Sequence, residues 1–549
     1  MAESSTDDIF LDPPKNTQYA TDKGCQTELT AAPIYLAADP RDSASSTKIS
    51  ETRKGKESAI VDWDGDDDPE KPENFSRLRK WIITVISGLM TICVTFASSV
   101  CSTATKVTAK HFHVSEEVMI LATSLFVLGF VFGPIIFGPL SELYGRKRPL
   151  FLGLFAFSIF QIPVAVAQNL QTIFICRFLG GLFASAPLAI VSGILADLFE
   201  DPVEHGIGVA VFASATFIGP VAGPIVGGFI TMSHLGWRWT EYITAIMTFF
   251  FSSIGYLLIP ETFEGTLLTK RAQRRRIVTK DWSLHAKAEE KVVSPKDIAT
   301  RYILRPFVML AQEPILILIT LYMGFIYGFL YICFEAYPIA FQQLRGCNDD
   351  VGALPFLSII CGVVVGCMII ITISLTRYRN IIRCTGSVNP EERLIPMMIG
   401  GILLPVGMFW FGWTSSPHIT WMPEVISGGF LGAGVLLIFL QGLNYIIDVY
   451  TMHTNSAIAA NTFFRSWLGA GSPLFASPMF HNLGVNWAMT LLGCLTAILF
   501  PVPIAFFDFW AENTNVEQIQ RGRLTFDKES PHLQVYRWGN DTPVEIFRL

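Results

Sequence analysis

Ionisable side chains inside long apolar runs are the residues of this chain with the clearest capacity for chemistry. Arg177 lies within the run TIFICRFLGGLFASAP. A charged side chain at the centre of a bilayer costs roughly 2.5–3.5 kcal/mol on insertion scales, so it is expected to face a cavity or a partner. Glu335 follows a continuous apolar and aromatic stretch, four residues after Tyr331 and on the same helical face. Because burial favours the neutral form of a carboxyl group, Glu335 is a candidate proton carrier.

The other ionisable groups near the apolar runs fall mostly at the ends of those runs, where we expect solvated, interfacial side chains. They are Asp197, Glu241, Glu313, Glu424, Asp448, Arg465 and His481. An interfacial position is also the alternative for Glu335. The first apolar run contains no acid or base, which excludes a carboxylate proton site there. It offers only hydroxyl groups, those of Ser98, Ser99, Ser102 and Thr103.

A second group of candidates lies between the second and third apolar runs, in GPLSELYGRKR. Glu142 and Arg146 are four residues apart at a helix end, so they can pair with each other or with a neighbouring helix end. Contacts that form in one conformation and break in another would act as a gate, whereas a basic cluster that only fixes membrane topology is the alternative. The candidate gate residues are Gly138, Glu142, Gly145, Arg146 and Lys147.

Twelve apolar stretches must position these groups, each close to the ~20 residues that a helix needs to cross ~30 Å of hydrocarbon. They cover 81–104, 118–139, 149–167, 171–195, 206–232, 241–259, 313–334, 351–375, 394–413, 420–447, 456–479 and 485–508. The runs are too long and too uniformly apolar to be barrel strands. Only 16% of the 549 residues are charged, far below the share in a soluble protein. The sequence therefore predicts an all-α membrane protein with twelve transmembrane helices.

The twelve runs divide into two sets of six, which predicts two pseudo-symmetric six-helix bundles around a central cavity. GPVAGPIVGG in the fifth run and GAGSPLFASP in the eleventh are similar and occupy matching places; two unrelated helices of this composition are the alternative. The polar N-terminal segment without apolar periodicity is expected to be disordered. The expected domains are a cytosolic tail at 1–80, bundles at 81–260 and 313–508, a cytosolic linker at 261–312 and a cytosolic C-terminal tail at 509–549.

Basic residues predict the orientation of the chain in the membrane. The stretch from Lys270 to Arg305 holds eleven Lys and Arg residues, and loops on the cytoplasmic side are enriched in both. We therefore expect the linker and both termini to be cytosolic. The N-terminus, MAESSTDDIF, has neither a basic nor an apolar region typical of a signal peptide.

The loop 138–148 resembles the signature loop of the major facilitator superfamily. Arg177 matches the arginine of that family's fourth span, which is associated with proton transfer, and GPVAGPIVGG resembles the fifth-span motif of its antiporter branch. The segments VDWDGDDDPEKPENFS and PETFEGTLLTKRAQRRR are similar to those of fungal twelve-span drug:proton antiporters. In the antiporter motif, glycines permit close packing and prolines bend the helix; packing alone is the alternative role. The motif residues are Gly219, Pro220, Gly223, Pro224, Gly227 and Gly228.

The resemblance implies a secondary transporter that exports a small organic compound across the plasma membrane, coupled to protons. A polyamine or organic-acid carrier, a vacuolar membrane and a non-transporting sensor are the alternatives. The sequence contains no nucleotide-binding glycine loop, no catalytic constellation and no metal-ligand spacing of its cysteines. We therefore expect no enzyme activity, no cofactor and no metal. We expect no binding of nucleic acid, because the basic residues form no continuous stripe. We also expect the chain to be a monomer.

Overall fold

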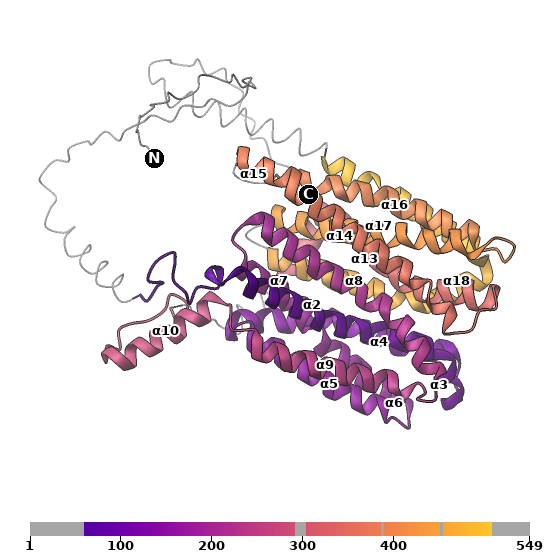
Figure 1. Cartoon of the computed structure of the whole chain (residues 1–549), viewed down its shortest axis with the longest axis horizontal. Helices are drawn as coiled ribbons and strands as arrows, with labels where there is room; N and C mark the ends of the chain where they lie inside the picture. The colour runs from indigo at the N-terminus through magenta and orange to yellow at the C-terminus, as the bar shows by residue number, and fades with distance from the viewer. Residues whose placement is uncertain (1–59, 291–303, 386–388, 451–453, 508–549) are drawn as a thin grey trace, which may run out of the picture. The chain divides into compact units, whose positions relative to one another are not determined.

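A computed structural model describes residues 60–290, 304–385, 389–450 and 454–507. Over these residues long helices run side by side (Figure 1). Eleven helical segments are long and apolar enough to cross a membrane. One of them, Ser456–Phe507, contains two spans, because Gly484 has φ 76° and ψ 158° and interrupts the helix between them. The described residues thus contain the twelve spans that the sequence predicts.

The first six spans form the N-terminal bundle. Their helices are α2 (Arg77–Ser99) continued by η2 (Val100–Ala104) and α3 (Thr105–Phe112), then α4 (Glu116–Tyr144), α5 (Lys147–Ala165), α6 (Leu170–Ala184) followed directly by α7 (Ala186–Leu198), α8 (Pro202–Met232) and α9 (Arg238–Leu258). The fourth span is divided between α6 and α7 at Ser185, next to Pro187 in the first turn of α7. Proline is tolerated there because the first N–H groups of a helix have no intrahelical acceptor.

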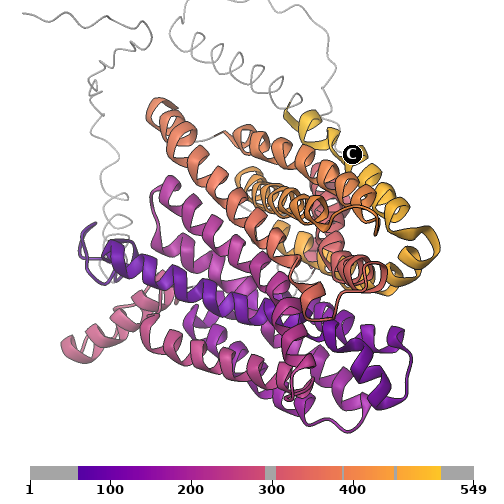
Figure 2. The ribbon, with the colours of Figure 1, turned by 45° about the vertical axis from the view of Figure 1, so that its right-hand side comes forward.

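The last six spans form the C-terminal bundle. Its elements are α12 (Arg305–Gln312), α13 (Pro314–Tyr337) continued by η4 (Pro338–Leu344), η5 (Val351–Ala353), α14 (Phe356–Ile373) continued by η6 (Ser374–Tyr378) and α15 (Arg379–Thr385), η7 (Pro390–Arg393), α16 (Leu394–Thr414), α17 (Trp421–Val449) and α18 (Thr454–Leu499). The two bundles lie against each other in both views (Figures 1 and 2). Contacts between them run along α4 with α18 and along α8 with α14.

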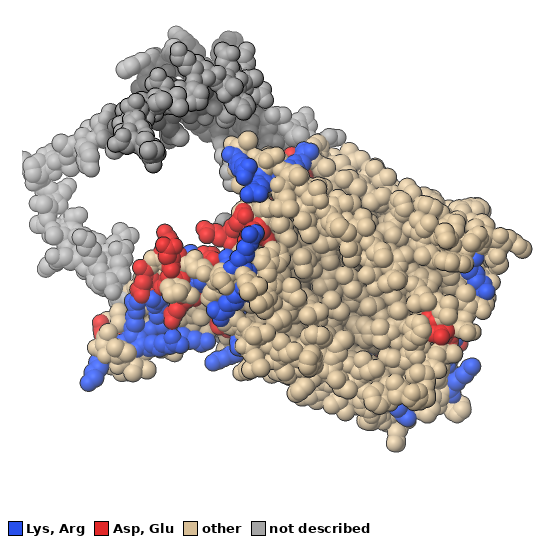
Figure 3. Space-filling model, in the orientation of Figure 1, with Lys and Arg blue, Asp and Glu red and all other residues tan. Residues whose placement is uncertain are grey.

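Charged side chains are unevenly distributed over the surface. Figure 3 shows Lys and Arg gathered at the end of the helices that carries α10 (Glu264–Thr279) and α15, with a broad uncharged surface along the helices. Large apolar side chains are exposed on the spans, as Leu257 at 80% exposure and Ile498 at 71% show. An uncharged, apolar surface of this kind is what a lipid environment favours.

Residues 60–70 pack against α10, although composition predicts a disordered tail over 1–80. Val61 lies with Leu268 and Ala272 in a small apolar cluster, and the Val61 N–H donates to the carbonyl oxygen of His285 at 2.8 Å. Asp68 is 2.5 Å from Nη1 of Arg271. We call this packing of residues 60–70 on α10 the clasp. The basic run read as a topology signal thus also binds the acidic segment before the first span. The tail before residue 60 and the C-terminal tail lie outside the described residues.

The clasp depends on the charge of Asp68. The backbone N–H of Glu70 and then the guanidinium of Arg271 hold the pKa of Asp68 at about 2. Because this value is lower than in the unfolded chain, the contribution of Asp68 is complete at neutral pH and is lost as the pH falls from about 4 towards 2. We expect Asp68→Asn to speed hydrogen exchange of residues 60–76 several-fold at pH 7. Asp67→Asn, at an exposed neighbour, is the control; equal exchange in the two variants would contradict this role.

Candidate transport path and gate

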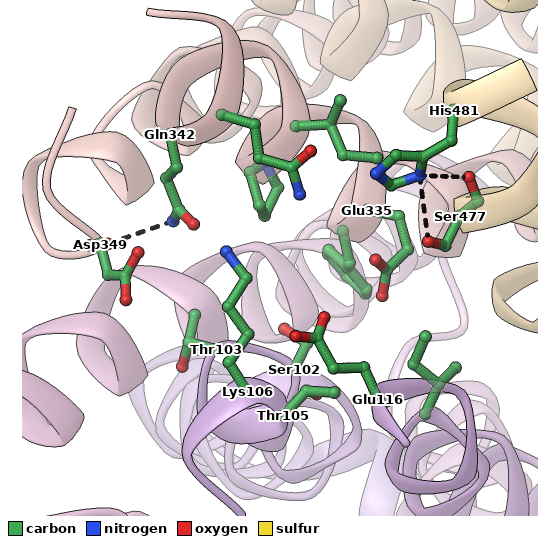
Figure 4. Close-up of a pocket in the computed structure, with 15 residues that line it drawn as sticks. Ser102, Thr103, Thr105, Lys106, Glu116, Glu335, Gln342, Asp349, Ser477 and His481 are labelled. Carbon is green, nitrogen blue, oxygen red and sulfur yellow. Dashed lines mark hydrogen bonds between the residues drawn. The ribbon is translucent and has the colours of Figure 1, made fainter. Parts of the chain in front are cut away.

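A polar pocket with a volume of about 270 Å³ lies between the two bundles, next to α3 (Figure 4). It is lined by residues of both bundles. Those with charge or titratable groups are Lys106, Glu116, Glu335, Asp349 and His481. We call this the outer pocket, because Thr105 and Lys106 of α3 line it and α3 lies at the end of the helices away from α10 (Figure 1).

The structure places Glu335 within the outer pocket, near the end of α13. Figure 4 shows its carboxylate between the carboxylate of Glu116 and the ring of His481. Nδ1 of His481 donates to the carbonyl oxygen of Ser477 at 2.8 Å, so Nε2 is the ring nitrogen left for the pocket. Glu335 is thus a partly exposed acid in a pocket that it shares with other titratable groups, as a proton-binding residue requires.

An aromatic layer closes the outer pocket towards the centre of the protein. The hydroxyl of Tyr331 donates to Oγ of Ser98 at 3.1 Å, and the hydroxyls of Tyr327 and Tyr331 are 3.4 Å apart. Ser98 belongs to the N-terminal bundle and the two tyrosines to the C-terminal bundle. The rings of Phe217 and Phe439 meet across the same interface, with centroids 4.8 Å apart. The two bundles are thus in direct contact at this level.

A second pocket of about 110 Å³ lies on the other side of this layer. The N-terminal bundle contributes Glu142 and Arg146 to its lining, and the C-terminal bundle contributes Thr462 of α18. We call it the inner pocket. Residues of α18 that lie three or four positions apart connect the inner pocket to the outer one along a single helical face. This face carries Thr462, Arg465, Gly469, Pro473, Ser477 and His481.

The candidate gate is held together by two acids. Gly145, at φ 88°, ends α4, and Arg146 is the N-cap of α5. Nε of Arg146 donates to Asp197 at 3.2 Å, and its Nη1 donates to Ser141 at 3.1 Å. The backbone N–H of Arg146 donates to Oε1 of Glu261 at 2.7 Å. Glu261 therefore supplies an acceptor and a negative charge to the N-terminus of α5, where both are stabilising.

The sequence does not reveal the roles of Glu261 and Asp197. Glu261 lies in the segment PETFEGTLLTKRAQRRR, and Asp197 is one of the acids expected at the membrane interface. A repeat between the two halves would have pointed to Asp197. Arg393 is the N-cap of α16 as Arg146 is of α5, and its Nε donates to Asp448 near the end of α17 at 3.0 Å. Each half thus pairs an arginine that begins its third span with an aspartate that ends its fourth.

Arg177 does not join Glu335 but forms a buried pair with Glu241. Nη1 of Arg177 is 3.5 Å from Oε1 of Glu241, and neither side chain has any solvent exposure. The guanidinium lies 4.8 Å from the ring centroid of Phe126, and Sγ of Cys101 donates to Glu241 at 2.5 Å. The expectation of an interfacial, solvated Glu241 is wrong. Its helix begins at Arg238 rather than at 241, and Glu241 faces the interior of the bundle.

Two more residues expected at the interface are buried. Glu424, in the first turn of α17, has no exposed side-chain surface and is 2.8 Å from the guanidinium of Arg345. Arg465 is 9% exposed and lies between aromatic rings of the C-terminal bundle. A helix end in a membrane protein can be covered by neighbouring helices, so a place near the end of an apolar run does not establish contact with water.

The glycines of the antiporter motif bring α8 against the first span. A Cβ at Gly219 would lie 2.8 Å from the carbonyl oxygen of Ile92, and one at Gly223 would lie 2.9 Å from the backbone nitrogen of Val100. Pro224 lacks the N–H that would bond the carbonyl of Pro220, and Oγ of Ser99 donates to that carbonyl at 2.5 Å. Gly228 instead faces the backbone of Asp349 in the C-terminal bundle. The motif therefore packs helices closely, as its composition predicts.

Comparison with known proteins identifies the family of this chain. A sequence model of the Major Facilitator Superfamily matches residues 87–473. The chain belongs to the Major Facilitator Superfamily. The transporter XylE, a proton:xylose symporter of this superfamily solved with 6-bromo-6-deoxy-D-glucose, aligns over 79% of this chain and 97% of its own, with a TM-score of 0.57 and 16% identity. That likeness supports the fold, with its two six-helix bundles.

Curated fungal relatives are similar over most of their length. The MFS-type transporter traF of Penicillium crustosum is 55% identical over 447 residues, which cover 81% of this chain and 90% of the relative. The citrinin biosynthesis cluster MFS transporter mrr1 of Monascus ruber is 51% identical and covers 82% of this chain and 91% of the relative. The chain is therefore a multi-pass membrane protein of a transporter family, as the motif at 138–148 indicates.

Proposed function

We propose that this superfamily member is a proton-coupled exporter of small organic compounds that works by alternating access. One observation carries the proposal: two pockets lie between the bundles, on opposite sides of a closed aromatic layer, and one face of α18 joins them. Rocking of the bundles would open the layer towards one pocket at a time. The outer pocket holds Glu335, the candidate proton carrier, and the inner pocket holds the gate residues Glu142 and Arg146.

The relatives support the export of a metabolite. The Monascus ruber relative is named for the citrinin biosynthesis cluster, and a biosynthetic cluster that makes a small compound has use for a protein that removes it. We therefore propose the plasma membrane as the location of this chain and a single chain as the working unit. The alternative location is the vacuolar membrane, where the same transport would move the compound into the vacuole instead of out of the cell.

Transport by purified protein in liposomes tests this function. The full chain is reconstituted, and uptake of cationic, neutral and anionic organic compounds is measured with and without a pH gradient. We expect at least one compound to accumulate against its concentration gradient only when the pH gradient is present. Binding of compounds without net flux in either direction would contradict transport and favour a sensor.

Both termini and the linker that contains α10 are proposed to be cytosolic. The basic side chains at the α10 and α15 end support this orientation (Figure 3). Protease added outside intact cells should spare tags placed at residues 1 and 549. Permeabilised cells provide the control for cleavage, and cleavage of either tag in intact cells would reverse the proposed orientation and exchange the inner and outer pockets.

Changes in the candidate gate should slow transport without preventing membrane insertion. Arg146→Ala removes the contacts with Asp197 and Ser141 but keeps the backbone N–H that Glu261 accepts from. Loss of a charged hydrogen bond worth ~1.5 kcal/mol in one conformation lowers the initial rate about tenfold. Glu142→Gln is expected to act in the same direction. Arg148→Ala, at an exposed neighbour, is the matched control. Parental rates in both gate variants would leave the loop as a topology signal only.

A further inference from the structure

Arg465 is a buried cation at the level of the aromatic layer. It lies on α18, one turn from Thr462 of the inner pocket and two turns from Pro473, which lines the small cavity beneath the outer pocket. The residue is 9% exposed. Its guanidinium carbon is 4.9 Å from the ring centroid of Tyr327 and 4.6 Å from that of Phe439. The cation thus occupies the segment of the path between the two pockets.

No acid pairs with Arg465 among the residues that the structure describes. Its Nε atom is buried without a hydrogen-bond acceptor in the described chain, and its contacts are with the faces of two rings. Cation–π contacts stabilise a guanidinium only in part. A buried charge without a partner is costly in a membrane protein, and such residues mark ligand or ion pathways.

Four other arginines with largely buried side chains, inside the spans or at their ends, are each paired with an acid. Arg177 contacts Glu241, Arg345 contacts Glu424, Arg146 contacts Asp197 and Arg393 contacts Asp448. Each of these four arginines thus has a carboxylate partner within the described residues. Arg465 differs from these four because no acid among the described residues pairs with it and because it lies between the two pockets.

We propose that Arg465 binds the acidic group of the transported compound, and that the substrates are small aromatic organic anions with a carboxylate or an acidic phenol. The guanidinium presents planar donors that match a carboxylate in two parallel hydrogen bonds. Tyr327 and Phe439, already against the cation, provide faces for the ring of such a compound. The substrate would thereby bring the countercharge that the described residues do not supply at this point. This inference deepens the proposed transport function and rests on it.

Three probes that share one ring system and differ in charge test the proposal. They are 1-naphthoate, its methyl ester and 1-naphthylmethylammonium, and their binding to the full chain in lipid nanodiscs is measured at pH 7. We expect the parent to bind the acid at least tenfold more tightly than the ester and the ammonium compound. Arg465→Gln should remove this preference and change the affinity for the ester less than about threefold, since only the acid gains a charged hydrogen bond.

Two further variants keep the test decisive. Arg379→Gln removes one positive charge from an exposed site on α15 and should leave the preference unchanged. Arg465→Lys keeps the charge without the planar fork, so it should retain a reduced preference for the acid; it also serves if Arg465→Gln fails to fold. Equal binding of the three probes, no binding of the acid at millimolar concentration, or an equal loss for all three in Arg465→Gln would overturn the proposal.

Flux measurements separate this inference from the proposed transport function. Accumulation of the ammonium compound driven by a pH gradient, without binding of the acid, would overturn the anion site and leave the transporter intact. Binding of the acid that depends on Arg465, without flux of any probe in either direction, would support the anion site and overturn transport.

Discussion

Glu335→Gln is expected to abolish accumulation driven by a pH gradient while leaving substrate exchange at equal pH on both sides. Glutamine matches the shape of glutamate, but its side chain does not take up or release a proton near neutral pH. The variant therefore loses proton coupling but keeps the path for the substrate. Glu335 lies in the outer pocket with Glu116, Lys106 and His481, and its carboxylate points into the pocket between Glu116 and His481 (Figure 4). A proton bound there would alter the charge at the entrance of the path as substrate passes.

The measurement uses liposomes that contain the parental or variant chain, with a pH step of one or two units imposed across the membrane. Glu116→Gln is the matched control, because it removes a carboxylate from the same pocket on the opposite bundle. We expect this control to shift the pH at which transport is half-maximal but to keep accumulation. Normal accumulation by Glu335→Gln would remove Glu335 from the mechanism, and loss of accumulation in Glu116→Gln alone would transfer the role to Glu116.

The spans were predictable because length and hydropathy act locally. A stretch that must cross the bilayer carries its own signal, and only a helix satisfies its backbone there. The run expected at 118–139 is α4, Glu116–Tyr144, and the runs expected at 456–479 and 485–508 lie on either side of the interruption at Gly484. The boundaries differ by a few residues, because polar residues at an interface can continue a helix.

Partners across the fold were not predictable in the same way. Arg177 and Glu241 are far apart in sequence and meet only because two helices pack face to face. The sequence marks Arg177 as exceptional, but it places Glu241 at the edge of an apolar run, where an exposed and a buried side chain look alike. Arg465 shows the converse. Its burial, and the buried Nε atom that has no acceptor among the described residues, are properties of the packed bundle.

The clasp was missed for a related reason. Residues 60–76 are polar and acidic, which is typical of a disordered segment when considered alone. Arg271, in the linker, changes that result because it neutralises Asp68 and Asp64 together. Charge complementarity between the acidic segment and the basic run was available in the sequence. It would have suggested the contact, but not the apolar cluster around Val61 that accompanies it.

Removing one member of the pair between Arg177 and Glu241 is expected to destabilise the protein more than removing both. Glu241→Gln leaves the guanidinium buried without a countercharge, and loss of one partner of a buried ion pair costs ~3–5 kcal/mol. Arg177→Gln should cost a similar amount. The double variant Arg177→Gln/Glu241→Gln buries two neutral groups and should recover a large part of that loss. Unfolding of the purified protein by titration with SDS in mixed micelles measures each free energy.

The pair is already incompletely bonded, and this makes a role in function testable. Nε and Nη2 of Arg177 and Oε2 of Glu241 have no hydrogen-bond acceptor or donor among the described residues. Arg177→Lys keeps the charge but loses the planar fork, so we expect strongly reduced flux driven by protons with substrate binding still detectable. A double variant that is stable but inactive would assign the pair to coupling. A double variant with parental stability and parental flux would show that the pair has a role neither in stability nor in coupling. Additive losses in stability would show that the two side chains do not interact.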